Sequence, residues 1–221
     1  VGAHYYLEVK HLLETKADTD ISQEDYIEIV RRVQRDFLEG IQTNIRMSAL
    51  ADFRKNMEMV FTKSYSRSHR LGELYEQELY AKVQDHNPKD QPRTLHSLLI
   101  KPKGEKKDFH PKFSNWRRRA KVPALLLNAT SLNTGHNWRF TARSMGEPPG
   151  LLGSEVDKNC RYRRLWYEQA PTEELRHYRL GYAVAASACV PGLFEPLVLE
   201  GLFPDKVVRL VDGGVHDNQG V

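Results

Sequence analysis

Near the end of the chain, an apolar run is followed by a single aspartate and then by two glycines. The stretch VVRLVDGGVHDNQGV covers residues 207–221, and within it Asp212 is followed by Gly213 and Gly214. A carboxylate at a strand end is placed for chemistry, because sites in open α/β sheets form at the carboxyl ends of strands. Asp-Gly-Gly is also a common turn sequence. The local pattern alone therefore leaves a catalytic role and a structural role open.

His216 offers a second arrangement within the same stretch. It lies four residues after Asp212 and is followed by Asp217, and a hydrolase with a Ser-His-Asp triad could use this pair. Histidines in loops mostly face solvent, so a catalytic role for His216 is disfavoured. The other histidines, including His136, show no metal-ligand spacing. These spacings therefore predict no metal site.

Periodicity predicts helices in the first half of the chain. Apolar residues at helical spacing predict helices over 2–16 and 22–39. Ser22 and Asp25 resemble a capping box at the start of the second helix, whose apolar face is expected to comprise Tyr26, Val30, Val33 and Phe37. Helix formers continue from Met47 to about Val83.

The strands are predicted in the second half of the chain. The nearly continuous apolar run over 122–130 predicts a strand buried on both faces, as in a parallel sheet. Alternation over 137–142 predicts another strand, and 194–201 and 207–214 are further candidates. The runs 122–128 and 207–211 are expected to share one sheet, with Asp212 just past the end of its strand.

Two further segments have a distinct character. Thr172 is expected to cap a helix that continues through a run of small residues, includes Cys189 as a buried thiol and stops near Pro191. Residues 84–121 are rich in turn formers and basic side chains and predict a long surface excursion. Its cations could meet phosphate or lipid headgroups, but a solvated loop is the favoured interpretation.

The composition is typical of a globular protein, and 221 residues are enough for one large α/β domain. The formal net charge is +4 and no aromatic–basic motif of a nucleic-acid module is visible, so no nucleic-acid partner is expected. Pro191, Glu195 and Pro196 interrupt the longest apolar stretch, which argues against a transmembrane helix. No signal peptide is visible, so a cytoplasmic or peripheral membrane location is expected.

Three segments together resemble the patatin-like phospholipase family, the lipid acyl hydrolases: NATSLNTG at 128–135, AVAASACVPGLFEPL at 183–197 and VDGGVHDNQG at 211–220. The resemblance implies a three-layer α/β/α fold with a mostly parallel central sheet. It makes Asp212 the aspartate of a Ser–Asp catalytic dyad, in a turn formed with Gly213 and Gly214. It also implies a lipid or acyl ester substrate, peripheral membrane contact and no cofactor.

The chain departs from the family pattern at the nucleophile. The family needs a Gly-x-Ser-x-Gly elbow, and neither that pattern nor the Gly-rich oxyanion loop occurs in residues 1–221. Residues 1–13 resemble the helix that leaves the elbow, so the serine is expected a few residues before Val1. The chain is accordingly expected to be the C-terminal portion of a single catalytic domain in a longer protein.

The expected serine upstream of Val1 has a geometric consequence, and the hydrolase interpretation has one alternative. If the serine precedes Val1, the start of the first helix should lie close to Asp212, at about 10 Å by chain reach. The rival is a catalytically silent module on the same scaffold that binds lipid or protein. Acyl specificity and oligomeric state do not follow from the sequence.

Overall fold

A computed structural model describes residues 1–42, 65–85, 87–88, 91–106, 109–149 and 162–217 of the chain. Its helices are α1 (Gly2–Thr15), α2 (Gln23–Gln42), α5 (Arg67–Glu78), α6 (Pro111–Ser114), α8 (Glu173–Arg176) and α9 (Leu180–Ser187). Its strands are β1 (Leu126–Ser131), β2 (Asn137–Thr141), β3 (Ser144–Gly146), β4 (Leu165–Trp166), β5 (Leu197–Phe203) and β6 (Lys206–Asp212). Residues 47–64 of the predicted helix-forming region lie outside the described residues.

The six strands form one sheet in the order β4-β3-β2-β1-β6-β5, and every neighbouring pair is antiparallel. The prediction of a mostly parallel central sheet is therefore wrong. Short connections explain the difference: β1 and β2 are joined by residues 132–136, and β5 and β6 by residues 204–205. Parallel neighbours need a crossover of a dozen or more residues, whereas such short loops allow only hairpins.

The burial of β1 also differs from that of a central parallel strand. Val122–Leu125 precede the strand, and Leu126 at its start is half exposed. Only the last three residues of β1 are consecutively buried. The apolar run was therefore a poor guide to strand direction, because it combines an extended segment outside the sheet with a strand that is buried at one end. β2, in contrast, alternates as predicted, with Trp138 and Phe140 fully buried.

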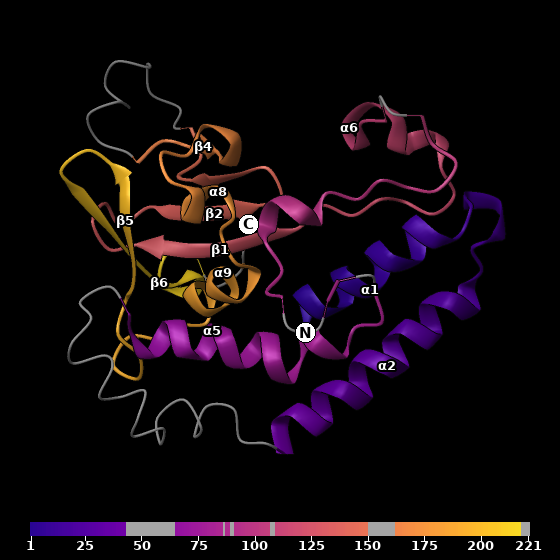
Figure 1. The fold of residues 1–221 in the computed structure, drawn as a ribbon, viewed down its shortest axis with the longest axis horizontal. Coiled ribbons are helices and arrows are strands. Elements are labelled where there is room, and N and C mark those ends of the chain that lie inside the picture. Colours follow the sequence, from indigo (N-terminus) through magenta and orange to yellow (C-terminus); the bar gives the residue numbers. More distant parts are fainter. Residues whose placement is uncertain (43–64, 86, 89–90, 107–108, 150–161, 218–221) are drawn as a thin grey trace.

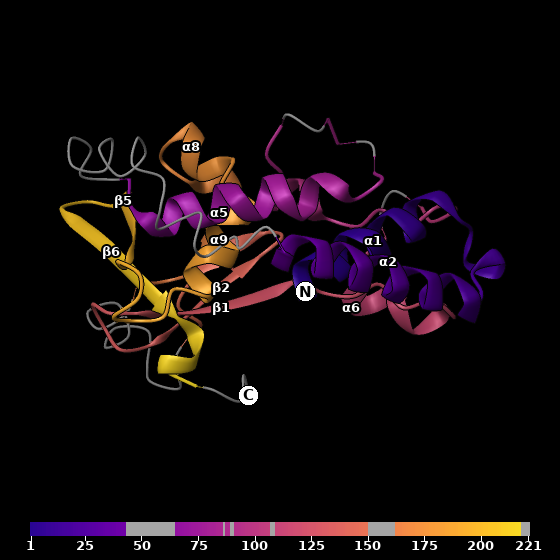
Figure 2. The same ribbon diagram turned by 90° about the horizontal axis from the view of Figure 1, so that it is seen from below.

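The helices do not enclose the sheet as the predicted three-layer fold requires. Figure 2 shows α5, α8 and α9 on one side of β1, β2 and β6, while α1 and α2 lie beside the end of the sheet. Figure 1 shows α5 running along the sheet and the segment that carries α6 standing away from it. The described part of the chain is thus a sheet covered by helices on one face, extended by a helical pair.

The predicted helical pair is confirmed with small shifts in its bounds. The backbone N–H of Ser22 donates to Asp25 Oδ2 at 3.0 Å and the Asp25 N–H donates to Ser22 Oγ at 3.4 Å, which completes the predicted capping box. On α2, Ile29 and Val33 are buried, whereas Val30 is exposed. The prediction for Val30 was wrong because the buried stripe is shifted by one residue toward Ile29.

The predicted helix after Thr172 is broken into α8 and α9. The Thr172 side chain accepts the Leu175 N–H, as predicted for its cap. The backbone at 178–180 then pairs with residues 93–95: the Tyr178 carbonyl accepts from Leu95 and the Leu180 N–H donates to Arg93. Tertiary hydrogen bonding therefore replaces one turn of helix between the two pieces.

Helices α5 and α9 cross at two glycines. A Cβ built on Gly72 would lie 2.7 Å from the carbonyl oxygen of Gly181, and one built on Gly181 would lie 2.8 Å from the carboxyl carbon of Glu76. Glu76 itself is buried, accepts the Gly181 N–H at 3.0 Å and pairs with Arg179. The absence of side chains at both glycines lets α5 and α9 approach each other closely.

We expect Gly181→Ala to destabilise the protein by about 1–3 kcal/mol, the usual cost of overpacking a close contact. Gly2→Ala is the matched control, because a Cβ there meets nothing within 4 Å; its effect should stay within about 0.5 kcal/mol. Urea unfolding of both variants measures the difference. Equal midpoints for the two variants would contradict the close packing of α5 on α9.

Candidate functional site

Asp212 is the last residue of β6, and it lies opposite Ala129 of β1. Its side chain is partly exposed, and its Oδ1 accepts the backbone N–H of Gly214 at 2.7 Å. This bond caps a 3₁₀ turn, Gly213–Val215. Because β6 runs antiparallel to β1, Asp212 faces the middle of β1 and not its carboxyl end. The carboxyl-end argument from parallel sheets therefore does not apply to this residue.

Gly213 is required by the close approach of this turn to β1. A Cβ at Gly213 would lie 2.6 Å from the carbonyl oxygen of Asn128 and 2.9 Å from its carbonyl carbon, a separation that real side chains do not adopt. Gly213 is buried, whereas Gly214 is exposed. The first glycine of the motif thus lets the turn pack against β1, and the second supplies the N–H that holds the carboxylate.

Thr130, on β1, stabilises the turn that follows Asp212 through two hydrogen bonds. Its Oγ1 donates to the carbonyl of Asp212 at 2.9 Å and accepts the backbone N–H of His216 at 3.1 Å, and the residue is almost fully buried. Sequence reasoning did not single out Thr130. The available signal was a threonine at the end of an apolar strand, where a buried hydroxyl needs partners.

His216 and Asp212 do not form a triad pair in the described residues. The His216 ring is exposed, and its Nδ1 lies 2.9 Å from the carbonyl oxygen of Gly135 in the β1–β2 turn. No hydrogen bond joins its ring to the Asp212 carboxylate. The backbone of the next residue, Asp217, donates to the Gly213 carbonyl. His216 and Asp217 are therefore parts of the folded turn that follows Asp212.

No described serine donates to the Asp212 carboxylate. Ser131 is buried and accepts from Thr134, and Ser68 is buried against the Cys189 thiol. Cys189 is free and buried, as predicted, and burial raises the pKa of its thiol, so it is a poor nucleophile. The expected approach of the start of α1 to Asp212, at about 10 Å by chain reach, stays a prediction.

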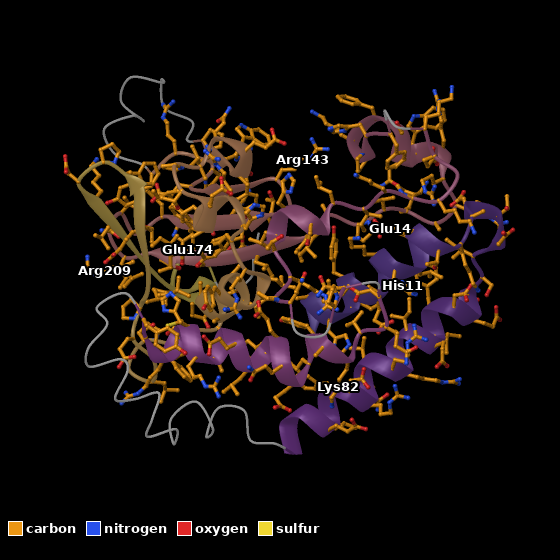
Figure 3. All side chains as sticks on the ribbon, in the orientation of Figure 1. His11, Glu14, Lys82, Arg143, Glu174 and Arg209 are labelled. Carbon is orange, nitrogen blue, oxygen red and sulfur yellow. The ribbon has the colours of Figure 1, made fainter. Side chains whose placement is uncertain are left out.

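Two surface hollows lie away from this turn. One, of about 470 Å³, lies along the β5–β6 hairpin and is lined by Pro171 and residues 200–207. The other, of about 260 Å³, lies between α1 and residues 85–98, and its lining includes Lys10, His11 and Glu14; Figure 3 labels His11 and Glu14 on α1. Asp212 lines neither hollow.

A buried polar cluster joins α1 to α2. His4, Glu8 and Asp36 are all buried, and their potential ligand atoms lie within 4.8 Å of one another. His4 Nε2 lies 3.6 Å from Asp36 Oδ2 and has no hydrogen-bond partner. Glu8 already pairs with Arg32 at 2.8 Å and Asp36 with Arg35 at 3.2 Å. Two cations thus balance the two carboxylates, so the cluster needs no metal to balance its charge.

Burial controls the titration of two histidines in the helical layer. Desolvation lowers the pKa of His4, although Asp36 and Glu8 oppose the effect. At the start of α5, the His69 Nδ1 accepts the Ser66 N–H, and desolvation lowers the pKa of His69 to about 4. Both rings are therefore neutral in the folded protein at neutral pH.

We expect the protein to lose stability as the pH falls from about 6.5, the ordinary histidine pKa, to about 4. In this window the unfolded chain binds a proton at position 69 and the folded chain does not, so acid favours unfolding, by up to about 1.4 kcal/mol per pH unit. Urea unfolding at several pH values measures this slope. It should be shallower in His69→Gln, which keeps an acceptor for Ser66, and unchanged in the exposed control His177→Gln.

We expect Thr130→Val to loosen the Asp212 turn while preserving side-chain volume. The substitution leaves the Asp212 carbonyl and the His216 N–H without their buried partner, at a cost of about 1–3 kcal/mol. Hydrogen exchange at the His216 amide should accelerate, and the urea midpoint should fall. Thr19→Val, at an exposed position, is the control. An unchanged rate of hydrogen exchange at the His216 amide would show that Thr130 does not stabilise the turn.

In comparisons with known proteins, no protein-family model, curated protein or solved structure matches the chain. Among the helices that the structure describes, none is long and apolar enough to cross a membrane. The functional argument therefore rests on the residues of the chain and their geometry.

Proposed function

We propose that Asp212 is the general base of a serine acyl hydrolase that cleaves lipid acyl esters at a membrane surface or in the cytoplasm. The nucleophilic serine and the oxyanion donors would be supplied from outside residues 1–221. One observation carries the proposal: Asp212 Oδ1 is held by the Gly214 N–H while the side chain remains partly open to solvent. A carboxylate fixed through one oxygen keeps the other available for a hydroxyl.

The fixed carboxylate suits the chemistry of a dyad. A serine hydroxyl is a poor nucleophile until a base takes its proton, and Asp212 Oδ2 would accept that proton as the serine oxygen attacks the ester carbonyl. The protonated carboxyl would then return the proton to the departing alkoxide, which leaves an acyl-serine. A water molecule, deprotonated by the same carboxylate, would release the fatty acid and regenerate the serine. No metal enters these steps.

The packing around Asp212 supports a site that keeps its position during turnover. Gly213 contacts the Asn128 backbone, and Thr130 binds the Asp212 carbonyl, so both the strand end and the turn are fixed relative to β1. General acid–base catalysis requires donor and acceptor within about 2.6–3.2 Å. A base on a mobile loop would meet this requirement only part of the time, whereas a base at a strand end is held in one position.

A second candidate is a catalytically silent module that binds lipid or protein. The observation that favours it is the sequence itself, because no Gly-x-Ser-x-Gly pattern and no Gly-rich oxyanion loop occur in residues 1–221. Ester hydrolysis by a longer protein separates the two candidates. A longer protein that contains this chain and the elbow pattern upstream should hydrolyse esters, and one without the pattern should not.

We expect residues 1–221 alone to show no turnover of a chromogenic acyl ester above that of Asp212→Asn. In a longer protein with an upstream elbow, Asp212→Asn should lower kcat by at least about 10²–10⁴, the usual contribution of a general base. Asp205→Asn is the matched control, because Asp205 is exposed at the β5–β6 turn and its φ of 57° suits asparagine. Retained kcat in Asp212→Asn together with a lost kcat in His216→Ala would replace the dyad with a triad.

A further inference from the structure

Two large aromatic side chains stand exposed on the segment that carries α6. Trp116 is 72% and Phe113 67% exposed, more than any other large apolar residue that the structure describes. They lie three residues apart, Phe113 on α6 and Trp116 on the following 3₁₀ turn, Asn115–Arg117. We call residues 111–117 the aromatic knob. In Figure 1 the knob stands away from the sheet, above α1.

Hydrogen bonds fix the backbone of the aromatic knob at its base, although its aromatic side chains are exposed. The Asn115 side chain makes two hydrogen bonds to the backbone of Val122, at 2.8 and 3.0 Å. Lys121 Nζ donates to the carbonyls of Asn115 and Trp116, each at 3.1 Å. These four hydrogen bonds close the base of the knob, so its aromatic side chains are presented outward by fixed backbone.

An ion-pair anchor attaches this segment to the helical pair. The Arg118 side chain is nearly fully buried and pairs with Glu105 at 2.7 Å and with Asp18 at 3.3 Å. Asp18, just after α1, also accepts the backbone N–H groups of Arg119 and Ala120, each at 2.9 Å. The knob is therefore fixed to the main body at its base while its tip stays open.

Positive charge is concentrated around the exposed aromatics. Residues 101–121 contain nine Lys or Arg and two acidic residues, an excess larger than the net charge of +4 of the whole chain. Lys112 Nζ lies 5.4 Å from the centre of the Phe113 ring, and Arg117 Cζ lies 5.1 Å from that of Trp116. Cations thus border both rings, and Glu105, an acid in this segment, is already paired.

We propose that the aromatic knob docks the protein onto anionic lipid bilayers. Tryptophan and phenylalanine partition into the interface between headgroups and acyl chains, and basic side chains extend to the headgroups around them. Anionic headgroups complement the surrounding cations, each of which contributes a further increment near the surface. The proposal is independent of the proposed hydrolase, because docking needs neither Asp212 nor a nucleophile.

The shape of the knob favours a bilayer over nucleic acid. Sites for single-stranded nucleic acid also combine aromatics with cations, but they lie in a groove that follows the strand. The aromatic knob is a projection, and Figure 3 shows side chains extending from this segment into open space. A projection can insert into a membrane interface, whereas it offers no wall along which a strand could lie.

Vesicle sedimentation with residues 1–221 tests the proposal. The protein should bind phosphatidylcholine vesicles that contain 30% phosphatidylserine and should not bind pure phosphatidylcholine vesicles. The variant Phe113→Ser/Trp116→Ser should bind at least tenfold more weakly, whereas Leu193→Ser, at another exposed apolar residue, should bind as the original protein does. Circular dichroism and urea unfolding confirm that each variant is folded.

A second pair of variants tests the charge. Arg117→Ala should weaken binding to the anionic vesicles about fivefold, the effect of one cation near the surface. Arg209→Ala, an exposed arginine at the opposite side of the molecule in Figure 3, should leave it unchanged. Asp212→Asn should also bind normally, which separates docking from hydrolysis.

Three outcomes overturn the proposal. The original protein could fail to bind anionic vesicles. The double variant could bind as tightly as the original protein. Single-stranded RNA could bind the original protein, lose affinity in the double variant and displace the vesicles, in which case the knob is a polyanion site and not a membrane anchor.

Discussion

The pairing of β1 with β6 is the constraint on which the rest of the structure depends. It joins the hairpin β5–β6 to the strands β1–β4, and without it the sheet would separate into two pieces. The pairing is extended past the strand end by Gly213, which packs on the Asn128 backbone, and by the Thr130 hydroxyl. The turn that carries Asp212 is therefore held against β1 by buried contacts.

Local chemistry made part of this fold predictable. The capping box of Ser22 with Asp25 and the cap of Thr172 are contacts within one turn, so the residue types and their spacing determine them. The alternation of β2 identified its buried face for the same reason, because side chains in a strand alternate between faces. Such features require no knowledge of distant parts of the chain.

Strand direction and helix continuity were predicted wrongly, for two different reasons. The apolar run over 122–130 is compatible with either direction, and only the short loops between neighbouring strands show that the sheet is antiparallel. The predicted helix after Thr172 is interrupted because its backbone at 178–180 bonds to residues 93–95, about 85 positions earlier in the chain. No local sequence pattern predicts these hydrogen bonds between residues 178–180 and 93–95.

The candidate site shows the same division between local and distant information. Asp212 with its two glycines was recognisable because an apolar run ends there, and its Asx-type cap follows from local spacing. Thr130 was not singled out, because its role arises from β1 lying beside β6. The orphan ring nitrogen of His4 and the arginines around its cluster likewise depend on the packing of α1 against α2.

One extended segment connects the aromatic knob to the Asp212 turn. The knob is closed by Asn115 on Val122, and the chain then continues through β1 to Thr130, which holds the turn. Val122 and Thr130 are eight residues apart, a length of chain that spans at most about 30 Å, so the base of the knob and the residue that holds the turn lie within that distance. Since the knob is anchored through Arg118 and the turn through the β1–β6 pairing, neither end can reorient without breaking buried contacts. A lipid surface that held the knob would thereby also fix the distance of the Asp212 carboxylate from the bilayer.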